Sequence, residues 1–254
     1  MKSLQQFDFE SLTESFSAYH CFGDKATGIL SSIDQPYKDI THWSVDDLRS
    51  KYCLAIFVFT DDAEVYAAEI DAFIRQYEDV VKGFFILDLH ASHQHKDFKE
   101  RWGFYNILTA RFSSLQDNIL HYLLFFKHFI ETMGLMCMEY YDFKICMRNA
   151  TFIAAGKTVP IKEAIQTIPH ENIRTLLLGL ELQNNLTDNA KEDEDMDAVA
   201  SFLDQLPDTI VIWQISQNFG NPHVEYIAGF DTEPVCETLA QLNVAITIQT
   251  ARIY

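Results

Sequence analysis

Two acidic side chains, Glu139 and Asp142, lie three residues apart near the middle of the chain. They follow a long apolar segment, residues 113–133, and a glycine. If a helix begins here, both carboxylates project from its first turn, where the positive end of the helix dipole favours negative charge. Acidic residues at this position commonly do no more than cap the helix. The alternative is that they take part in chemistry, and only the surrounding structure distinguishes the two.

A second group of residues that could do chemistry lies earlier in the chain. Residues 88–95 contain one aspartate and three histidines, His90, His93 and His95. Imidazole and carboxylate groups bind zinc and related metals, so a metal-dependent enzyme centred on these histidines is one interpretation. The three histidines lie in one expected loop at the end of a strand, and the sequence identifies no distant fourth ligand. We therefore favour an ordinary polar loop.

Two further patterns fail at specific positions. Residues 155–158 end in Gly-Lys-Thr like a phosphate-binding loop, but the motif needs its first glycine at position 151, which is Thr151. None of the five cysteines forms a CxxC pair, and three lie inside apolar runs. Cys137 or Cys146 would act as a nucleophile only with a histidine partner that the sequence does not place. We expect both to be reduced and packed in the core.

The elements that must position these residues alternate between helix and strand. In the first half, helical segments 43–50 and 63–77 alternate with buried-strand segments 53–59 and 82–89, followed by an amphipathic segment, 96–108. This is the pattern of βαβ units. The second half follows the order strand, helix, strand, helix, strand, strand, which favours a mixed sheet with helices packed on it. The class is therefore α/β.

The segment between the two halves, residues 113–133, is expected to form one long helix. Its apolar residues recur at helical spacing and cover nearly all of its circumference: Leu115, Ile119, Tyr122, Leu123, Phe126, Phe129 and Ile130. Such a helix is expected to lie sandwiched between two packed bodies. We therefore predict one α/β subdomain over residues 1–113, a central helix over 114–134, and a second subdomain over 135–254.

Composition limits the classes of partner. The 254 residues, 48% of them hydrophobic, suffice for one large or two small domains. A formal net charge of −18 argues against a nonspecific surface for nucleic acid or for an anionic membrane. No signal peptide and no apolar run of about 18 residues is apparent, so we expect a cytoplasmic protein. The acidic run 191–197 is interpreted as a solvated helix face, with a basic partner as the alternative.

Residues 134–142 and the segments that follow them resemble the bacterial tubulin-like cell-division GTPase FtsZ. That family has a central helix followed by a Gly-Leu-hydrophobic motif with two acidic residues, which matches Gly134-Leu135-Met136 with Glu139 and Asp142. Further matches to family strands and one helix are residues 150–156, 161–168, 173–182, 208–215 and 223–231. The resemblance covers roughly residues 20–231. It implies an FtsZ/tubulin-like fold with a truncated Rossmann-like N-terminal subdomain, a long central helix and an α+β C-terminal subdomain with a mixed sheet.

The glycine-rich loops with which that family binds nucleotide are missing. After the strand 54–59, the turn 60–64 reads Thr-Asp-Asp-Ala-Glu, and its two aspartates would repel phosphates. Residues 22–28 resemble the lead-in to another phosphate loop, but the expected glycines after Gly28 are replaced by Ile-Leu-Ser. We also expect too little room before Phe22 for the opening strand, loop and helix of the family. The resemblance thus implies a degenerate member without a nucleotide cofactor or GTPase activity of its own.

What the resemblance implies about function starts from the family's filament, in which the acidic loop of one subunit completes the GTPase site of its neighbour. Glu139 and Asp142 would then face the nucleotide of a partner, FtsZ or another tubulin-like subunit, and the chain would cap or modulate that filament in cell division. The family usually has asparagine at Cys137 and aspartate at Glu139, which weakens the catalytic analogy. The alternatives are self-association, or an unrelated interaction scaffold that reuses the fold.

Overall fold

The structure is a computed structural model, and it describes residues 17–34, 53–90, 95–131, 138–158, 168, 172–183, 189–206, 208–218 and 223–234. In the first half the elements are β1 (Ser17–Phe22), α1 (Asp24–Asp34), β2 (Ala55–Thr60), α2 (Ala67–Tyr77), β3 (Phe84–Asp88), α3 (His95–Trp102) and β4 (Tyr105–Leu108). The second half has α4 (Leu115–Phe126), the π-helical turn η3 (Lys127–Glu131), α5 (Tyr140–Arg148), β5 (Phe152–Thr158), β6 (Ile173–Gln183), α7 (Asn189–Leu203), β7 (Ile210–Asn218) and β8 (His223–Phe230).

The strands form one eight-stranded sheet in the order β1-β2-β3-β4-β5-β8-β6-β7. Strands β1 to β5 are parallel, β8 is antiparallel to both β5 and β6, and β7 is parallel to β6. The predicted mixed α/β architecture is therefore confirmed. The two halves join where β4 pairs with β5, at Ile107 with Phe152 and Leu108 with Ile153.

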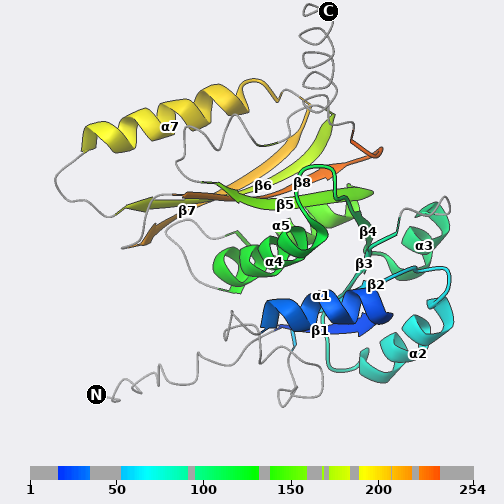
Figure 1. Cartoon of the computed structure of the whole chain (residues 1–254). Coiled ribbons are helices and arrows are strands. Elements are labelled where there is room, and N and C mark those ends of the chain that lie inside the picture. The colour runs from blue at the N-terminus through cyan, green and yellow to red at the C-terminus, as the bar shows by residue number, and fades with distance from the viewer. Residues whose placement is uncertain are drawn as a thin grey trace, which may run out of the picture.

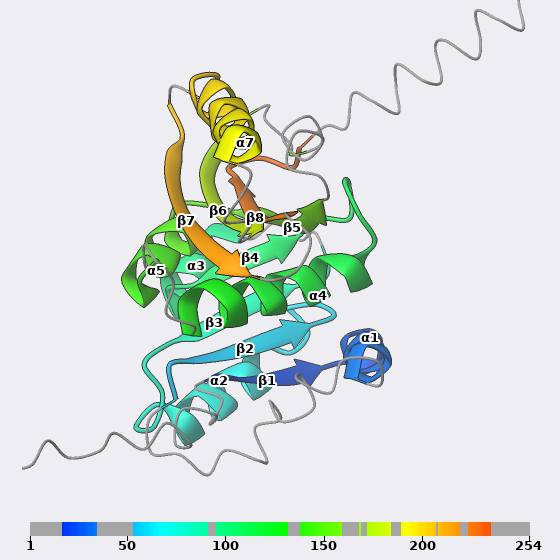
Figure 2. The same cartoon turned by 90° about the vertical axis from the view of Figure 1, so that its left-hand side faces the viewer.

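Helices cover both faces of this sheet (Figure 1, Figure 2). Alternate strand residues point to opposite faces, so Phe57 of β2 packs with α4 and α5 while its neighbour Val58 belongs to the core on the side of α2 and α3. Every residue of β2 is buried. Burial on both faces explains why this strand is a continuous apolar run without polar alternation.

As its sequence predicts, helix α4 is buried around most of its circumference. The side chain of Ser114 caps it by accepting a hydrogen bond from the Asp117 backbone N–H, at 3.1 Å. The helix contacts α1, β4, β5 and β8, and both views show it between β2 and the strands of the second half (Figure 1, Figure 2). Beyond Phe126 it continues as the π-helical turn η3, a wider helix that the sequence did not predict.

Two parts of the first half differ from expectation. The residues before Phe22 were expected to leave too little room for the family's opening strand, loop and helix, but one strand, β1, ends at Phe22, and helix α1 begins at Asp24. The amphipathic segment 96–108 divides into α3 and β4 because Gly103, at φ +79°, ends the helix in a conformation that favours glycine. The predicted segments 43–50 and 161–167 lie outside the described residues.

No helix within the described ranges is both long enough and apolar enough to cross a bilayer.

Candidate functional site

The parallel strands β1 to β4 bring the residues that follow them to one edge of the sheet, which we call the carboxyl edge. Open α/β sheets bind their ligands at this edge, beside the ends of the strands. Gly23 follows β1, Asp61 and Asp62 follow β2, and Asp88 ends β3. Three carboxylates therefore lie where a bound ligand is expected in this class of fold.

The carboxylate of Asp61 occupies the N-terminus of α1. Its Oδ2 accepts a hydrogen bond from the Lys25 backbone N–H at 2.9 Å, and its Oδ1 accepts one from the Ala26 N–H at 2.6 Å. These are N–H groups that the helix itself cannot satisfy. Helix N-termini at this edge commonly bind phosphate, and here the chain supplies the anion.

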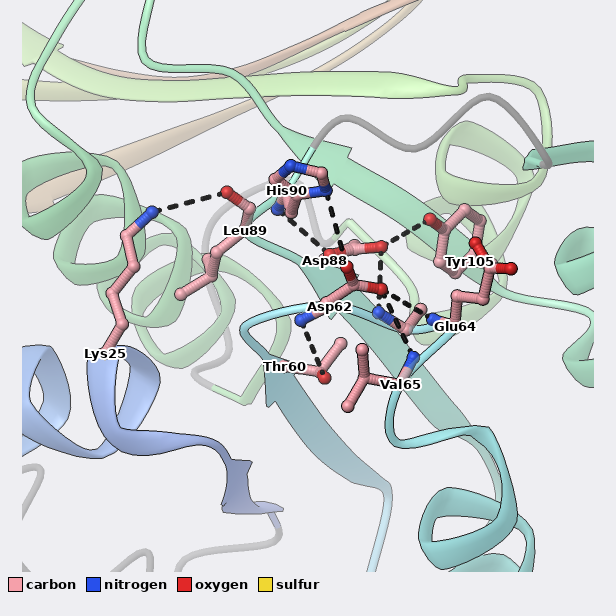
Figure 3. A network of polar contacts seen from close by, with 10 residues as sticks. Lys25, Thr60, Asp62, Glu64, Val65, Asp88, Leu89, His90 and Tyr105 are labelled. Carbon is pink, nitrogen blue, oxygen red and sulfur yellow. Dashed lines mark hydrogen bonds and ion pairs between the residues drawn. The ribbon is translucent and has the colours of Figure 1, made fainter.

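Asp62 and Asp88 bind neighbouring backbone groups in the same way (Figure 3). Asp62 Oδ1 accepts hydrogen bonds from the N–H groups of Glu64 and Val65, at 2.9 and 3.3 Å. The buried Asp88 accepts from the Tyr105 hydroxyl at 2.7 Å, and also from the Ala63 and His90 N–H groups. The expected acidic turn is thus an internally satisfied network.

Electrostatics at this edge disfavour a phosphate group. Burial raises the pKa of Asp88, an effect opposed by hydrogen bonds such as that from Tyr105 and reinforced by the charge of Asp62. The nearby cation, Lys25, lies with its Nζ 3.5 Å from the carbonyl oxygen of Leu89 and not against a carboxylate (Figure 3). An incoming anion would therefore meet carboxylates at short range.

The three histidines proposed as metal ligands are only partly described. His90 is largely exposed, and its Nδ1 lies 3.6 Å from Asp62 Oδ2. His93 and the side chain of His95 lie outside the described residues. Among the side chains that the structure describes, no group of three or more His, Cys, Asp or Glu is arranged to hold a metal ion. The metal site at these histidines stays an untested alternative to the polar loop that the sequence favours.

The second candidate pair, Glu139 and Asp142, starts α5. Asp142 Oδ2 accepts a hydrogen bond from the Glu139 backbone N–H at 2.9 Å, which is the contact expected of a capping residue. The Glu139 side chain is exposed, and Tyr141 beside it exposes 67% of its surface. Glu139 and Asp142 thus form a capping box, in which each side chain accepts from the backbone of the other's position, and the Glu139 side chain and the Tyr141 ring are at the same time exposed to solvent.

This acidic turn lies at the opposite edge of the parallel strands, which we call the amino edge. Tyr140 packs its ring against Phe85 of β3, and its hydroxyl lies against Gly83, which immediately precedes β3. The Met138 N–H donates to the buried Gln214 Oε1 at 2.7 Å, which fixes the approach to the turn. Acidic groups therefore lie at both edges. At the carboxyl edge their oxygens accept hydrogen bonds from the chain itself, and at the amino edge the Glu139 side chain is exposed.

Sequence reasoning missed a buried ionic cluster on the second half of the sheet. Glu225 of β8 has no exposed surface, and its carboxylate lies 3.1 Å from His128 Nδ1, 3.3 Å from His223 Nε2 and 3.4 Å from Lys157 Nζ. Burial alone would raise the pKa of this carboxyl, but the hydrogen bonds from both histidines and the charge of Lys157 outweigh burial and lower it. A glutamate inside an apolar strand was the available signal.

The predicted packing of Cys146 is confirmed. The side chain is fully buried, and burial raises the pKa of its thiol to about 12. The thiolate is therefore scarce at neutral pH, which argues against a nucleophilic role. Cys137 lies outside the described residues.

No protein-family model and no curated protein matches this sequence. Solved structures resemble it. CetZ from Methanosaeta thermophila is 14% identical, with a TM-score of 0.41 over 92% of this chain and 66% of that one. A GTPγS-form TubZ protofilament from Bacillus thuringiensis is 14% identical, with a TM-score of 0.40 over 93% of this chain and 68% of that one. The GDP-bound CetZ1 monomer from Haloferax volcanii is 12% identical, with a TM-score of 0.47 over 88% of this chain and 78% of that one.

This chain thus spans about two thirds of the length of the first two of these structures. With identities of 12 to 14% and TM-scores below 0.5, the similarities do not by themselves assign the chain to a family.

Proposed function

We propose that this chain is a tubulin-like protein that uses no nucleotide of its own and acts as a cap or modulator of an FtsZ/tubulin-like filament in the cytoplasm. It would bind through its amino edge, with Glu139 and Asp142 facing the nucleotide-bearing edge of a partner subunit. The support comes from the motif at residues 134–142, the buried central helix and the polarity of the sheet.

The observation that carries the proposal is the different state of the two edges. At the carboxyl edge, the carboxylates of Asp61, Asp62 and Asp88 accept hydrogen bonds from the chain's own backbone N–H groups. At the amino edge, the Glu139 carboxylate is exposed beside the exposed Tyr141. A subunit of this kind would have one edge that can meet a neighbour's nucleotide, whereas the described part of its other edge carries carboxylates where the phosphates of a nucleotide would lie, so it would end a filament.

In this role the chain's residues would act on chemistry held by the partner. Asp142 is oriented by its bond to the Glu139 N–H, and Glu139 has the reach and the exposure to accept a proton from a water molecule. A carboxylate so placed positions or polarises the attacking water, a contribution typically worth 10²–10⁴-fold in rate. GTP hydrolysis by this chain alone is not expected.

The first test is calorimetric titration of GTP and GDP, with magnesium, into the full chain. We expect no heat of binding at millimolar nucleotide. Micromolar binding would contradict the proposal and make an active GTPase the leading interpretation.

The second test adds the chain, below stoichiometric amounts, to an FtsZ filament that is followed by sedimentation and phosphate release. We expect shorter filaments or altered GTP turnover, and loss of that effect in Glu139→Gln/Asp142→Asn. The matched control is Glu100→Gln/Asp204→Asn, which makes the same change of charge at exposed positions on α3 and after α7. Equal effects of the two double variants, or no effect of the chain itself, would favour the separate interaction scaffold.

A further inference from the structure

We propose that the Asp61 carboxylate is an internal substitute for an anionic ligand, which keeps the carboxyl edge of this chain closed to phosphate. The inference rests on the proposed function only in that it explains why this edge takes no nucleotide. The contact is an intramolecular, autoinhibitory one, made between the end of β2 and the start of α1.

The geometry of Asp61 is that of a bound anion. Its two oxygens bond separate, consecutive N–H groups, those of Lys25 and Ala26, at 2.9 and 2.6 Å. The residues lie 35 and 36 positions apart in the chain, so the contact is not a local turn. A phosphate at a helix N-terminus uses this same donor arrangement.

The backbone on both sides is built around this carboxylate. Gly23 has φ +103°, and a Cβ placed on it would overlap the Asp61 carboxyl group. From the other side, the Asp61 N–H donates to the Phe22 carbonyl oxygen at 2.9 Å, which extends the β1–β2 pairing by one bond. Gly23 therefore provides the close approach that an anionic ligand needs at such a loop, and the space is filled by Asp61.

Displacement of Asp61 by a free anion is opposed by charge. Asp62 follows it directly and Asp24 lies in the first turn of α1, so a released Asp61 carboxylate and an entering phosphate would share one acidic region. A carboxylate that belongs to the chain also loses no translational entropy when it binds here, whereas a free anion does. The internal occupant should therefore prevail at any ordinary phosphate concentration.

The test is thermal unfolding of the full chain in pyrophosphate and in chloride of matched ionic strength. The midpoint temperature of the native chain should be the same in both. Asp61→Ala should lower it by about 2–4 °C in chloride, the usual consequence of losing a helix cap in a chain of this size. Pyrophosphate should then restore at least half of that loss, because it can bind the two freed N–H groups.

Two further variants separate an internal ligand from an ordinary cap. Asp24→Asn removes one negative charge from the same turn but leaves Asp61 in place, so pyrophosphate should not stabilise it. Asp61→Asn keeps the shape of the side chain and removes its charge. It serves as the test variant if Asp61→Ala fails to fold, and pyrophosphate should raise its midpoint temperature by a smaller amount. Stabilisation of the native chain by pyrophosphate would overturn the inference, as would equal responses of Asp61→Ala and Asp24→Asn. Neither result depends on filament binding, so this failure is distinguishable from failure of the proposed function.

Discussion

At the scale of single residues, Glu225 is a fully buried charge that three side chains contact. A fully buried carboxylate would be unfavourable alone, and here His128, His223 and Lys157 compensate for it. Such an arrangement costs little while it is complete, but removal of one member leaves buried charge without a partner. Because His128 belongs to η3 and Glu225 to β8, the cluster also fixes the end of the central helix on the sheet.

We expect Glu225→Gln to lower the free energy of unfolding by about 3 kcal/mol near neutral pH, in the range found when one partner of a buried ion pair is removed. Urea unfolding followed by circular dichroism measures this. The matched control is Glu233→Gln, which removes an exposed ion pair with Arg111 and should cost no more than about 1 kcal/mol. Similar losses in both variants would show that the buried cluster contributes no more to stability than the exposed ion pair does.

The same cluster predicts a pH dependence with a definite sign. The pKa of Glu225 is lowered from its ordinary value of 4.5, so the folded state binds this proton less readily than the unfolded state. Its contribution to stability is complete above pH 4.5 and is lost as the pH falls below that value. The difference between native chain and Glu225→Gln should therefore shrink from pH 5 toward pH 3. A constant difference across that range would contradict the assignment.

At the scale of elements, the start of α5 depends on one glycine. The Tyr140 hydroxyl is buried without a hydrogen-bond partner, and a Cβ on Gly83 would overlap it. The acidic turn is therefore held close to β3 by a contact that tolerates no additional atom. The position of Glu139 follows from this packing and from the Met138–Gln214 bond.

Gly83→Ala should therefore lower the free energy of unfolding by about 1–3 kcal/mol through overpacking. The added variant Tyr140→Phe should recover most of that loss, because it removes the overlapping oxygen. Gly28→Ala is the control, since a Cβ there meets nothing within 4 Å and replaces glycine inside helix α1. The double-variant cycle in urea should give a coupling well above the experimental error, and strict additivity would refute the contact.

At the scale of the whole molecule, the two halves share one sheet and one central helix. Asn118 of α4 links them further, because its Nδ2 donates to the Thr109 carbonyl oxygen and its Oδ1 accepts from the Ala155 N–H, both at 2.7 Å. A molecule joined in this way should unfold as a unit. The sequence-based division at residues 113/114 and 134/135 would then mark regions of one cooperative fold.

Fluorescence of Trp102 in the first half and Trp213 in the second can test this cooperativity. Each is measured in a variant whose other tryptophans are replaced by phenylalanine. We expect the two urea transitions to coincide with each other and with the loss of circular dichroism. Separated midpoints would instead support two subdomains that unfold independently.

The sequence by itself determined the class of fold and most of the elements. Strands β2, β3 and β6 and helix α4 are mostly buried, and buried elements consist largely of apolar residues. These apolar runs can be recognised locally in the sequence. The pairing of Glu139 with Asp142 at a helix start was also predictable, because capping is a local interaction between residues three apart.

Only the tertiary structure decided what the carboxylates do. The two aspartates of the turn 60–64 predict that it repels phosphate, and this stays a prediction, but nothing local could show that Asp61 bonds to α1 from 35 residues away. The same holds for Glu225 and its partners on η3 and β5. These contacts depend on strand order and on which side chains a parallel sheet brings to one edge, and such long-range placement leaves no periodic signal in the sequence.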